Sequence, residues 1–232
     1  MTRNQRFPRA DRHVAPHRPV RAPARSVVRD PRPVAAFRQR GAQSGLKLED
    51  FNAPEIWHPE TERVRTRFVV QPAGSGFRHA VTIDEVRDRL AQLPAKFSRN
   101  LDVVQFSAMT RKRRLFPCYG MQWGTSVYLY PIEESLVEIY RHPPTPQQQI
   151  EAHMFGGRWS QAGNVWELTW SDDSIRDFYL NNVLIHEVGH LNDSRNTNSR
   201  DRERFANWFA IEYGYRANQT SSPRSTRIRR TS

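Results

Sequence analysis

Hydrophobic and polar residues in the central part of the chain follow strand-like spacings in several places. The stretch 64–70 alternates in part and is rich in β-branched residues, which is typical of a strand. Apolar runs at 101–106 and 126–130 predict two further strands. The stretches 158–160 and 165–170, separated by Gln-Ala-Gly-Asn, predict a β-hairpin.

Three other stretches show the spacing of amphipathic helices. Thr82 and Glu85 form a capping box, after which apolar residues recur at helical spacing until Pro94. A second helical pattern begins after Ser171, and a third spans 199–215. These elements predict an α+β fold, in which a small, mostly antiparallel sheet packs against helices.

Both ends of the chain differ in composition from this centre. Residues 1–45 are rich in Arg, Pro and Ala, and residues 217–232 in Ser, Thr and Arg. Such segments cannot bury enough apolar surface to offset the entropy lost on ordering. We therefore predict disordered arms at 1–45 and 217–232 on either side of one domain at 46–216. The arms carry most of the formal net charge of +12, so the domain is nearly neutral.

Composition also excludes several classes of protein. The single cysteine, Cys118, rules out an intrachain disulfide and a thiolate-rich metal site. No apolar run approaches the ~18 residues that a membrane-spanning helix needs, and the N-terminus shows no apolar core of a secretory signal. These features predict a cytoplasmic protein without a membrane span, and they leave its oligomeric state open.

The string His186-Glu187-Val188-Gly189-His190 lies within the second helical pattern. Side chains four residues apart on a helix lie on one face, so His186 and His190 can present their imidazoles to one ion. Glu187 is offset around that face, which suits contact with a metal-bound water rather than with the metal. The pattern predicts a zinc site in which Glu187 handles protons.

This string resembles the active-site helix of the zincin metallopeptidases. The resemblance implies that His186 and His190 bind zinc (Zn²⁺) and that Glu187 is the catalytic base. Zincins also place an edge strand before this helix to hold an extended substrate. The segment Val127–Pro131 resembles that strand.

A third protein ligand is expected from the same resemblance. The metzincin pattern needs other residues where Asp193 and Asn196 stand, so that subclass is disfavoured. Gluzincins take a Glu from a following helix, and Glu203–Ala210 resembles the glutamate helix of thermolysin-like enzymes. It is also weakly similar to the Glu-x-Glu-Ala-Asn-x-Phe-Ala stretch of ImmA/IrrE-type metallopeptidases. We expect Glu203 to be the ligand, with Asp201 and Asp193 as alternatives.

Helical spacing supports Glu203 separately. Glu203, Ala206 and Asn207 share one face, and its small residues would allow close approach to a helix that carries Gly189. Metal-bound histidines usually donate their second ring N–H to a carboxylate or carbonyl. Asp193 and Asn207 are the candidates for that orienting contact.

Basic residues carry a weaker functional signal. The cluster 111–114 lies between strands, where a solvated hairpin loop is the expected structure. The Arg-rich arms can bind phosphates through counterion release, but they lack the interleaved aromatics that stack on bases. Nucleic-acid contact through the arms is therefore a secondary hypothesis.

Three functions follow from these features. The first is a zinc-dependent metallopeptidase that hydrolyses a peptide or protein substrate with a metal-activated water. The second is a non-catalytic zinc-binding interaction domain. The third is a nucleic-acid-associated protease, similar to SprT-like proteins, that its basic arms bring to its substrates. Glu187 favours catalysis, because a purely structural zinc site needs no carboxylate at that position.

Overall fold

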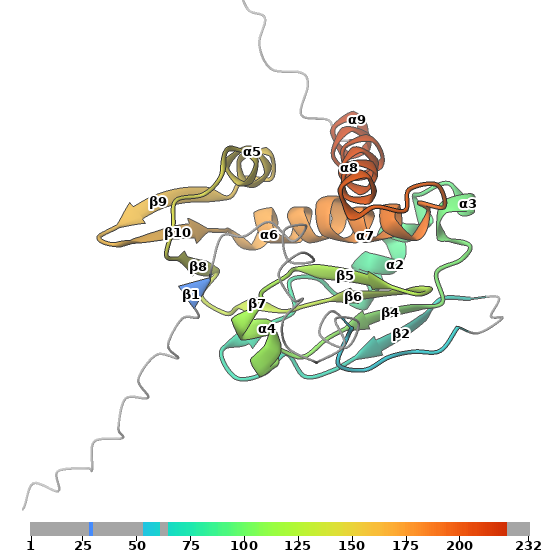
Figure 1. Cartoon of the computed structure of the whole chain (residues 1–232), viewed down its shortest axis with the longest axis horizontal. Helices are drawn as coiled ribbons and strands as arrows, with labels where there is room; N and C mark the ends of the chain where they lie inside the picture. The colour runs from blue at the N-terminus through green and yellow to red at the C-terminus, as the bar shows by residue number, and fades with distance from the viewer. Residues whose placement is uncertain (1–27, 30–52, 61–64, 222–232) are drawn as a thin grey trace, which may run out of the picture.

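The computed structural model describes residues 28–29, 53–60 and 65–221, and side chains are described up to residue 219. It contains both helices and small mixed sheets, so the chain has an α+β fold (Figure 1). Within the described ranges, none of the helices combines the length and the apolar character needed to cross a membrane. Most of the two predicted arms lies outside these residues.

The sheet beside the long C-terminal helices has four strands in the order β2-β4-β6-β5. They are β2 (Arg67–Val70), β4 (Val103–Phe106), β6 (Ser126–Leu129) and β5 (Gly120–Trp123). Strands β2, β4 and β6 run parallel, and β5 is antiparallel to β6. This sheet is therefore mixed, whereas the pattern predicted mostly antiparallel pairing. Every residue of β4 and β6 is buried, as is typical of strands covered on both faces.

A second sheet contains the predicted hairpin. Strands β9 (Arg158–Ala162) and β10 (Val165–Thr169) pair antiparallel, and β10 also pairs antiparallel with β8 (Val137–Tyr140). Strand β1 (Val28–Arg29) pairs parallel with β8. These two residues lie in the arm predicted to be disordered, and backbone pairing with the edge of β8 corrects that prediction for them. A separate pair joins β3 (Phe77–Arg78) to β7 (Ile132–Glu133).

In the described part of the chain, four helices lie between the strands. They are α2 (Ile83–Ala91), α3 (Ala95–Ser98), α4 (Arg111–Leu115) and α5 (Pro146–Met154). The predicted Thr82–Glu85 capping box is present at the start of α2. The basic cluster predicted as a hairpin loop instead forms α4, because Thr110 caps that helix.

Two continuous helical rods form the C-terminal part of the described residues. The first consists of α6 (Asp172–Phe178), the π-helix η2 (Tyr179–Val183) and α7 (Leu184–Leu191). The second consists of α8 (Ser199–Ala210), the π-helix η3 (Ile211–Arg216) and α9 (Ala217–Ser221). Helix α9 extends this rod into the segment 217–232 that was predicted to be a disordered tail. Figure 1 shows α5 and α8 on the side of the first rod that faces away from the sheet.

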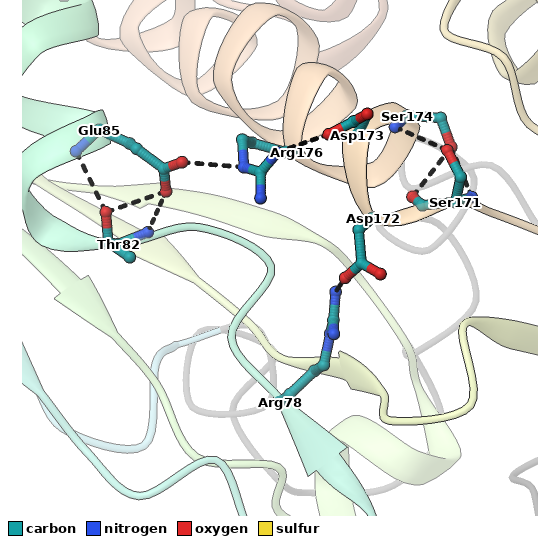
Figure 2. A network of polar contacts seen from close by, with 8 residues as sticks. All are labelled: Arg78, Thr82, Glu85, Ser171, Asp172, Asp173, Ser174 and Arg176. Carbon is teal, nitrogen blue, oxygen red and sulfur yellow. Dashed lines mark hydrogen bonds and ion pairs between the residues drawn. The ribbon is translucent and has the colours of Figure 1, made fainter.

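The first rod is anchored at its N-terminus by polar contacts (Figure 2). Ser171 caps α6, and Asp172 accepts a hydrogen bond from Arg78 of β3. Arg176 Nε lies 2.8 Å from Glu85 Oε1, so the glutamate of the α2 capping box also contacts α6. These pairs are partly exposed and contribute little stability, but they fix where the rod starts relative to α2.

The two rods touch each other without intervening side chains at two points. A Cβ on Gly189 would lie 3.0 Å from the Cα of Ala206, and one on Gly214 would lie 1.9 Å from the carbonyl oxygen of Asn181. The predicted close approach at Gly189 is therefore confirmed. Buried Arg89 joins the rods from α2, because it donates 2.6 Å to Asn181 Oδ1 and donates also to the Tyr213 carbonyl.

Candidate metal centre

Three side chains from the two rods converge on one point. His186 and His190 extend from α7, with their Nε2 atoms 3.0 Å apart. Glu203 of α8 places one carboxylate oxygen 3.4 Å from His186 Nε2 and the other 3.5 Å from His190 Nε2. One ligand atom from each of the three lies within 4.8 Å of the others. The structure thus brings together the three residues predicted as metal ligands.

The local fold explains this convergence. The two histidines are one turn apart on α7, and the Gly189–Ala206 contact brings α8 close enough for the shorter Glu side chain to reach them. Ala206 lies one turn after Glu203 on α8, so the same small face that packs on α7 carries the carboxylate. The π-helix η2 directly precedes α7, and π-turns often occur near functional sites.

The distance between the two imidazole nitrogens is close to that of a tetrahedral zinc shell. Zinc binds imidazole nitrogen at about 2.0–2.1 Å, so two such nitrogens are about 3.3 Å apart in a tetrahedral shell. The two Nε2 atoms are 3.0 Å apart, and each lies near a different oxygen of Glu203, at 3.4 Å for His186 and 3.5 Å for His190. Two imidazoles and a carboxylate form a donor set that zinc accepts.

Electrostatics at the three residues also favour a positive charge between them. Burial opposes ionisation of Glu203, but hydrogen bonds with His186 and His190 hold the pKa of its carboxyl well below the usual range. Burial lowers the pKa of His186, yet its hydrogen bond with Glu203 and the charges of Glu187 and Glu203 outweigh that effect and raise it. Both shifts reflect the attraction between the Glu203 carboxylate and a positive charge beside it.

Glu187 lies beside these three residues and is held by strand β5. Only 7% of Glu187 is exposed, and this burial raises the pKa of its carboxyl. The backbone N–H of Gln122 forms a hydrogen bond with that carboxyl. A Cβ on Gly120 would lie 2.9 Å from both Cγ and Oε1 of Glu187, so only glycine leaves the carboxylate this space.

Strand β5 lies beside helix α7, where the resemblance to zincins led us to expect the segment Val127–Pro131. Most of that segment belongs to β6, which pairs with β4 on one side and β5 on the other. Tyr130 N donates to Tyr119 O, so the alternation of an antiparallel pair turns the backbone groups of Gly120 and Gln122 away from β6. Strand β6 is therefore an internal strand, and the prediction that Val127–Pro131 forms an edge strand was wrong.

The alternative ligands have other partners. Asp193 accepts hydrogen bonds from the backbone N–H groups of Arg195 and Asn196, and Asp201 accepts from Asn198 at the start of α8. Neither joins a metal-holding group among the described residues. The buried Nδ1 of His190 has no hydrogen-bond partner within the described part of the chain. Neither of the two candidates, Asp193 and Asn207, therefore makes an orienting contact with Nδ1 of His190.

Two charged residues near the site, Glu151 and Arg202, were not anticipated from the sequence. Asn182 donates a hydrogen bond to Glu151 of α5, and the charge of Glu151 contributes to the raised pKa of His186. On α8, Arg202 donates 3.3 Å to the side-chain oxygen of Gln122. A signal for α5 was present, since Thr145 and Gln148 form a capping box with proline at the first turn.

Comparison of the chain with protein-family models, with curated proteins and with solved structures finds no match. The resemblance to zincins thus remains a prediction from the short motif.

Proposed function

We propose that this chain is a zinc-dependent metallopeptidase, with His186, His190 and Glu203 as metal ligands and Glu187 as general base. The observation that carries the proposal is the position of Glu187. Its carboxylate lies beside the three converging side chains, yet a backbone N–H of β5 holds it apart from the group that could ligate a metal. A site that served structure alone would need no fourth side chain with a separately held carboxylate.

The donor set supports zinc as the cation. Imidazole nitrogen suits zinc, and three protein ligands leave a fourth position for water, as in catalytic rather than structural sites. Zinc, when bound, supplies Lewis-acid activation that lowers the pKa of a water molecule to about 7. The side chains of His186, His190 and Glu203 are 18%, 11% and 22% exposed. The three ligands would therefore hold the ion close to the protein surface, within reach of solvent.

Glu187 would take the proton from the attacking water and pass it to the leaving amine. Its burial raises the pKa of the carboxyl, which brings the group closer to the neutral range where a general base works well. The hydrogen bond from Gln122 and the contact with Gly120 keep the carboxylate in one orientation. Orientation of this kind supplies much of the benefit of a catalytic group.

The β5 edge would align the substrate. The backbone groups of Gly120 and Gln122 turn away from β6, and the Gln122 N–H donates to Glu187, so an extended peptide can pair with the edge beside that contact. Pairing along this edge would bring a peptide carbonyl next to Glu187. A peptide or protein substrate is therefore the class that this proposal names.

Metal content and peptidase activity of purified full-length variants test the proposal. We expect one zinc per wild-type chain and per Glu187→Gln chain, with hydrolysis of an unfolded protein substrate only by the wild type. Loss of a general base is expected to reduce the rate by about 100- to 10,000-fold. His190→Ala and Glu203→Ala should lose both zinc and activity, whereas Asp193→Ala, which removes a nearby carboxylate outside the group, should keep both.

Two results would count against this function. Equal zinc content in wild type and His190→Ala would remove the metal site. Zinc bound by the wild type without any hydrolysis, even when Glu187 is present, would favour a non-catalytic zinc-binding domain.

A further inference from the structure

Helix α5 brings a carboxylate to the N-terminal side of the metal centre. The capping box at Thr145 and Gln148 starts this helix, and buried Ala152 packs it into the core. Glu151, next to Ala152, is half-buried and accepts a hydrogen bond from Asn182 of η2. The position of the Glu151 carboxylate is thereby tied to the rod that carries the histidines.

The hydrogen bond with Asn182 shows where Glu151 lies relative to the metal centre. Asn182 precedes His186 by four residues, which places it about one helical turn away on the same face. The charge of Glu151 also acts on His186. The negative group therefore flanks the metal centre on the side of residue 182.

A positive group lies at the other end of the β5 edge. Gly120 approaches Val183 and Glu187, while Gln122, two residues farther along β5, contacts Arg202 through its side chain. Along the first rod, Glu151 is thus level with Asn182, Glu187 follows, and Arg202 lies beyond Glu187 at Gln122. Both charges are partly buried, and both are held by amide side chains.

From this order we propose that the β5 edge selects extended peptides by charge, accepting a basic side chain near Glu151 and an acidic side chain near Arg202. The inference rests on the proposed peptidase function, and it names the substrate class of that same site. A partly buried charge that already has a fixed position loses little entropy on pairing, so each contact discriminates more than a freely mobile surface pair.

Two peptides of equal composition provide the test. One carries Lys before Glu and the other carries Glu before Lys, on either side of the same neutral residues, and both bear a fluorescent label. Binding is measured by anisotropy to the zinc-loaded full chain with Glu187→Gln, which leaves the peptides uncut. We expect one order to bind at least about fivefold more tightly than the other, the factor of one ion pair near 1 kcal/mol.

Second substitutions assign this preference to the two residues. Glu151→Gln keeps an oxygen for Asn182 but removes the charge, and Arg202→Gln removes the opposite charge. Each substitution should bring the ratio of the two peptides' dissociation constants closer to one. The controls Glu134→Gln and Arg204→Gln make the same charge changes at exposed positions and should leave the ratio unchanged.

The outcomes separate this inference from the proposed function. Equal binding of the two peptides, or a ratio that Glu151→Gln and Arg202→Gln do not alter, overturns charge selection. If the wild type cuts both peptides at equal rates, peptidase function stands and charge selection fails. If the preference is present and Glu151-dependent but the zinc-loaded wild type cuts neither peptide, charge selection stands and hydrolysis fails.

Discussion

The cluster around Glu203 and the cluster around Glu55 both centre on a carboxylate whose pKa is lowered, but they balance its charge in different ways. At Glu55, buried Arg113 lies 3.2 Å away, and Thr110 and Tyr130 donate hydrogen bonds. The guanidinium of Arg113 also lies 4.3 Å above the ring of Tyr130. The counter-charge therefore belongs to the chain and is permanent.

At Glu203 the partners are two imidazoles, which are cationic only when protonated. Their Nε2 atoms face each other as well as the carboxylate, and Nδ1 of His190 is left without a hydrogen-bond partner in the described residues. A metal ion would satisfy the carboxylate oxygens and the two Nε2 atoms without a proton. The comparison teaches that the Glu55 cluster contains a permanent counter-charge, whereas the Glu203 cluster contains none, which fits the proposed metal centre.

Zinc-dependent stability gives the largest expected difference between the two clusters. With free zinc at about 1,000 times its dissociation constant, we expect the free energy of unfolding to rise by about 4 kcal/mol in the wild type. Glu203→Ala should lose most of this increment. Arg113→Met should keep it, yet lower the zinc-free stability by about 3 kcal/mol, because it leaves Glu55 without its cation. Urea unfolding with and without zinc measures both quantities.

Glu212→Ala is the matched control for this comparison, because Glu212 lies on the same rod as Glu203 in an exposed pair with Arg216. It should change neither quantity by more than about 0.5 kcal/mol. A zinc increment that Glu203→Ala retains in full, or that Arg113→Met abolishes, would reverse the assignment of the two clusters.

The dependence of Glu187 on a glycine gives a smaller and more local effect. In Gly120→Ala the new Cβ would meet Val183 as well as Glu187, and the flexible carboxylate is the group that can move away. We expect zinc content to persist while peptidase activity falls by about 100-fold, as for loss of a positioned base. Metal analysis and rate measurements on one preparation decide this, and unchanged activity would show that β5 does not position Glu187.

Local patterns were sufficient for much of the site. The HExxH spacing placed His186 and His190 on one face, and the small face of α8 predicted the close approach at Gly189. Glu203 could be ranked above Asp193 and Asp201 before its contacts were known. These features succeed because they depend on the geometry of single helices, which is regular.

Features that depend on distant partners could not be predicted in the same way. Strand β5 is Gly-Met-Gln-Trp, which lacks the β-branched residues that mark a strand, and it becomes the edge only because β6 pairs with β4. Parallel pairing of β2, β4 and β6 likewise leaves no trace in the spacing of their residues. Arg113 is buried within a basic run because α4 turns that one side chain toward Glu55, which lies far away in sequence.

The smallest expected effect is the pH dependence that the complete cluster contributes. Burial alone would raise the pKa of Glu55, but Arg113 and the hydrogen bonds from Thr110 and Tyr130 bring it below the ordinary value of 4.5. The unfolded chain then binds this proton more readily, so the stabilisation is present above the ordinary pKa and is lost as pH falls through the lower, folded value. Because 28% of the Glu55 side chain is exposed, the contribution should stay below about 1 kcal/mol.

Zinc-free wild type and Glu55→Gln, unfolded in urea at about pH 7 and about pH 3, measure this contribution. The stability gap between the two proteins should be wider at the higher pH and should narrow as Glu55 takes up a proton. Glu212→Gln, at a carboxylate exposed to solvent, should show no such narrowing. A stability gap of equal size at both pH values would mean that Arg113 does not hold the Glu55 carboxyl in its charged form. The Glu55 cluster could then no longer serve as the example of a permanent counter-charge with which the Glu203 cluster is compared.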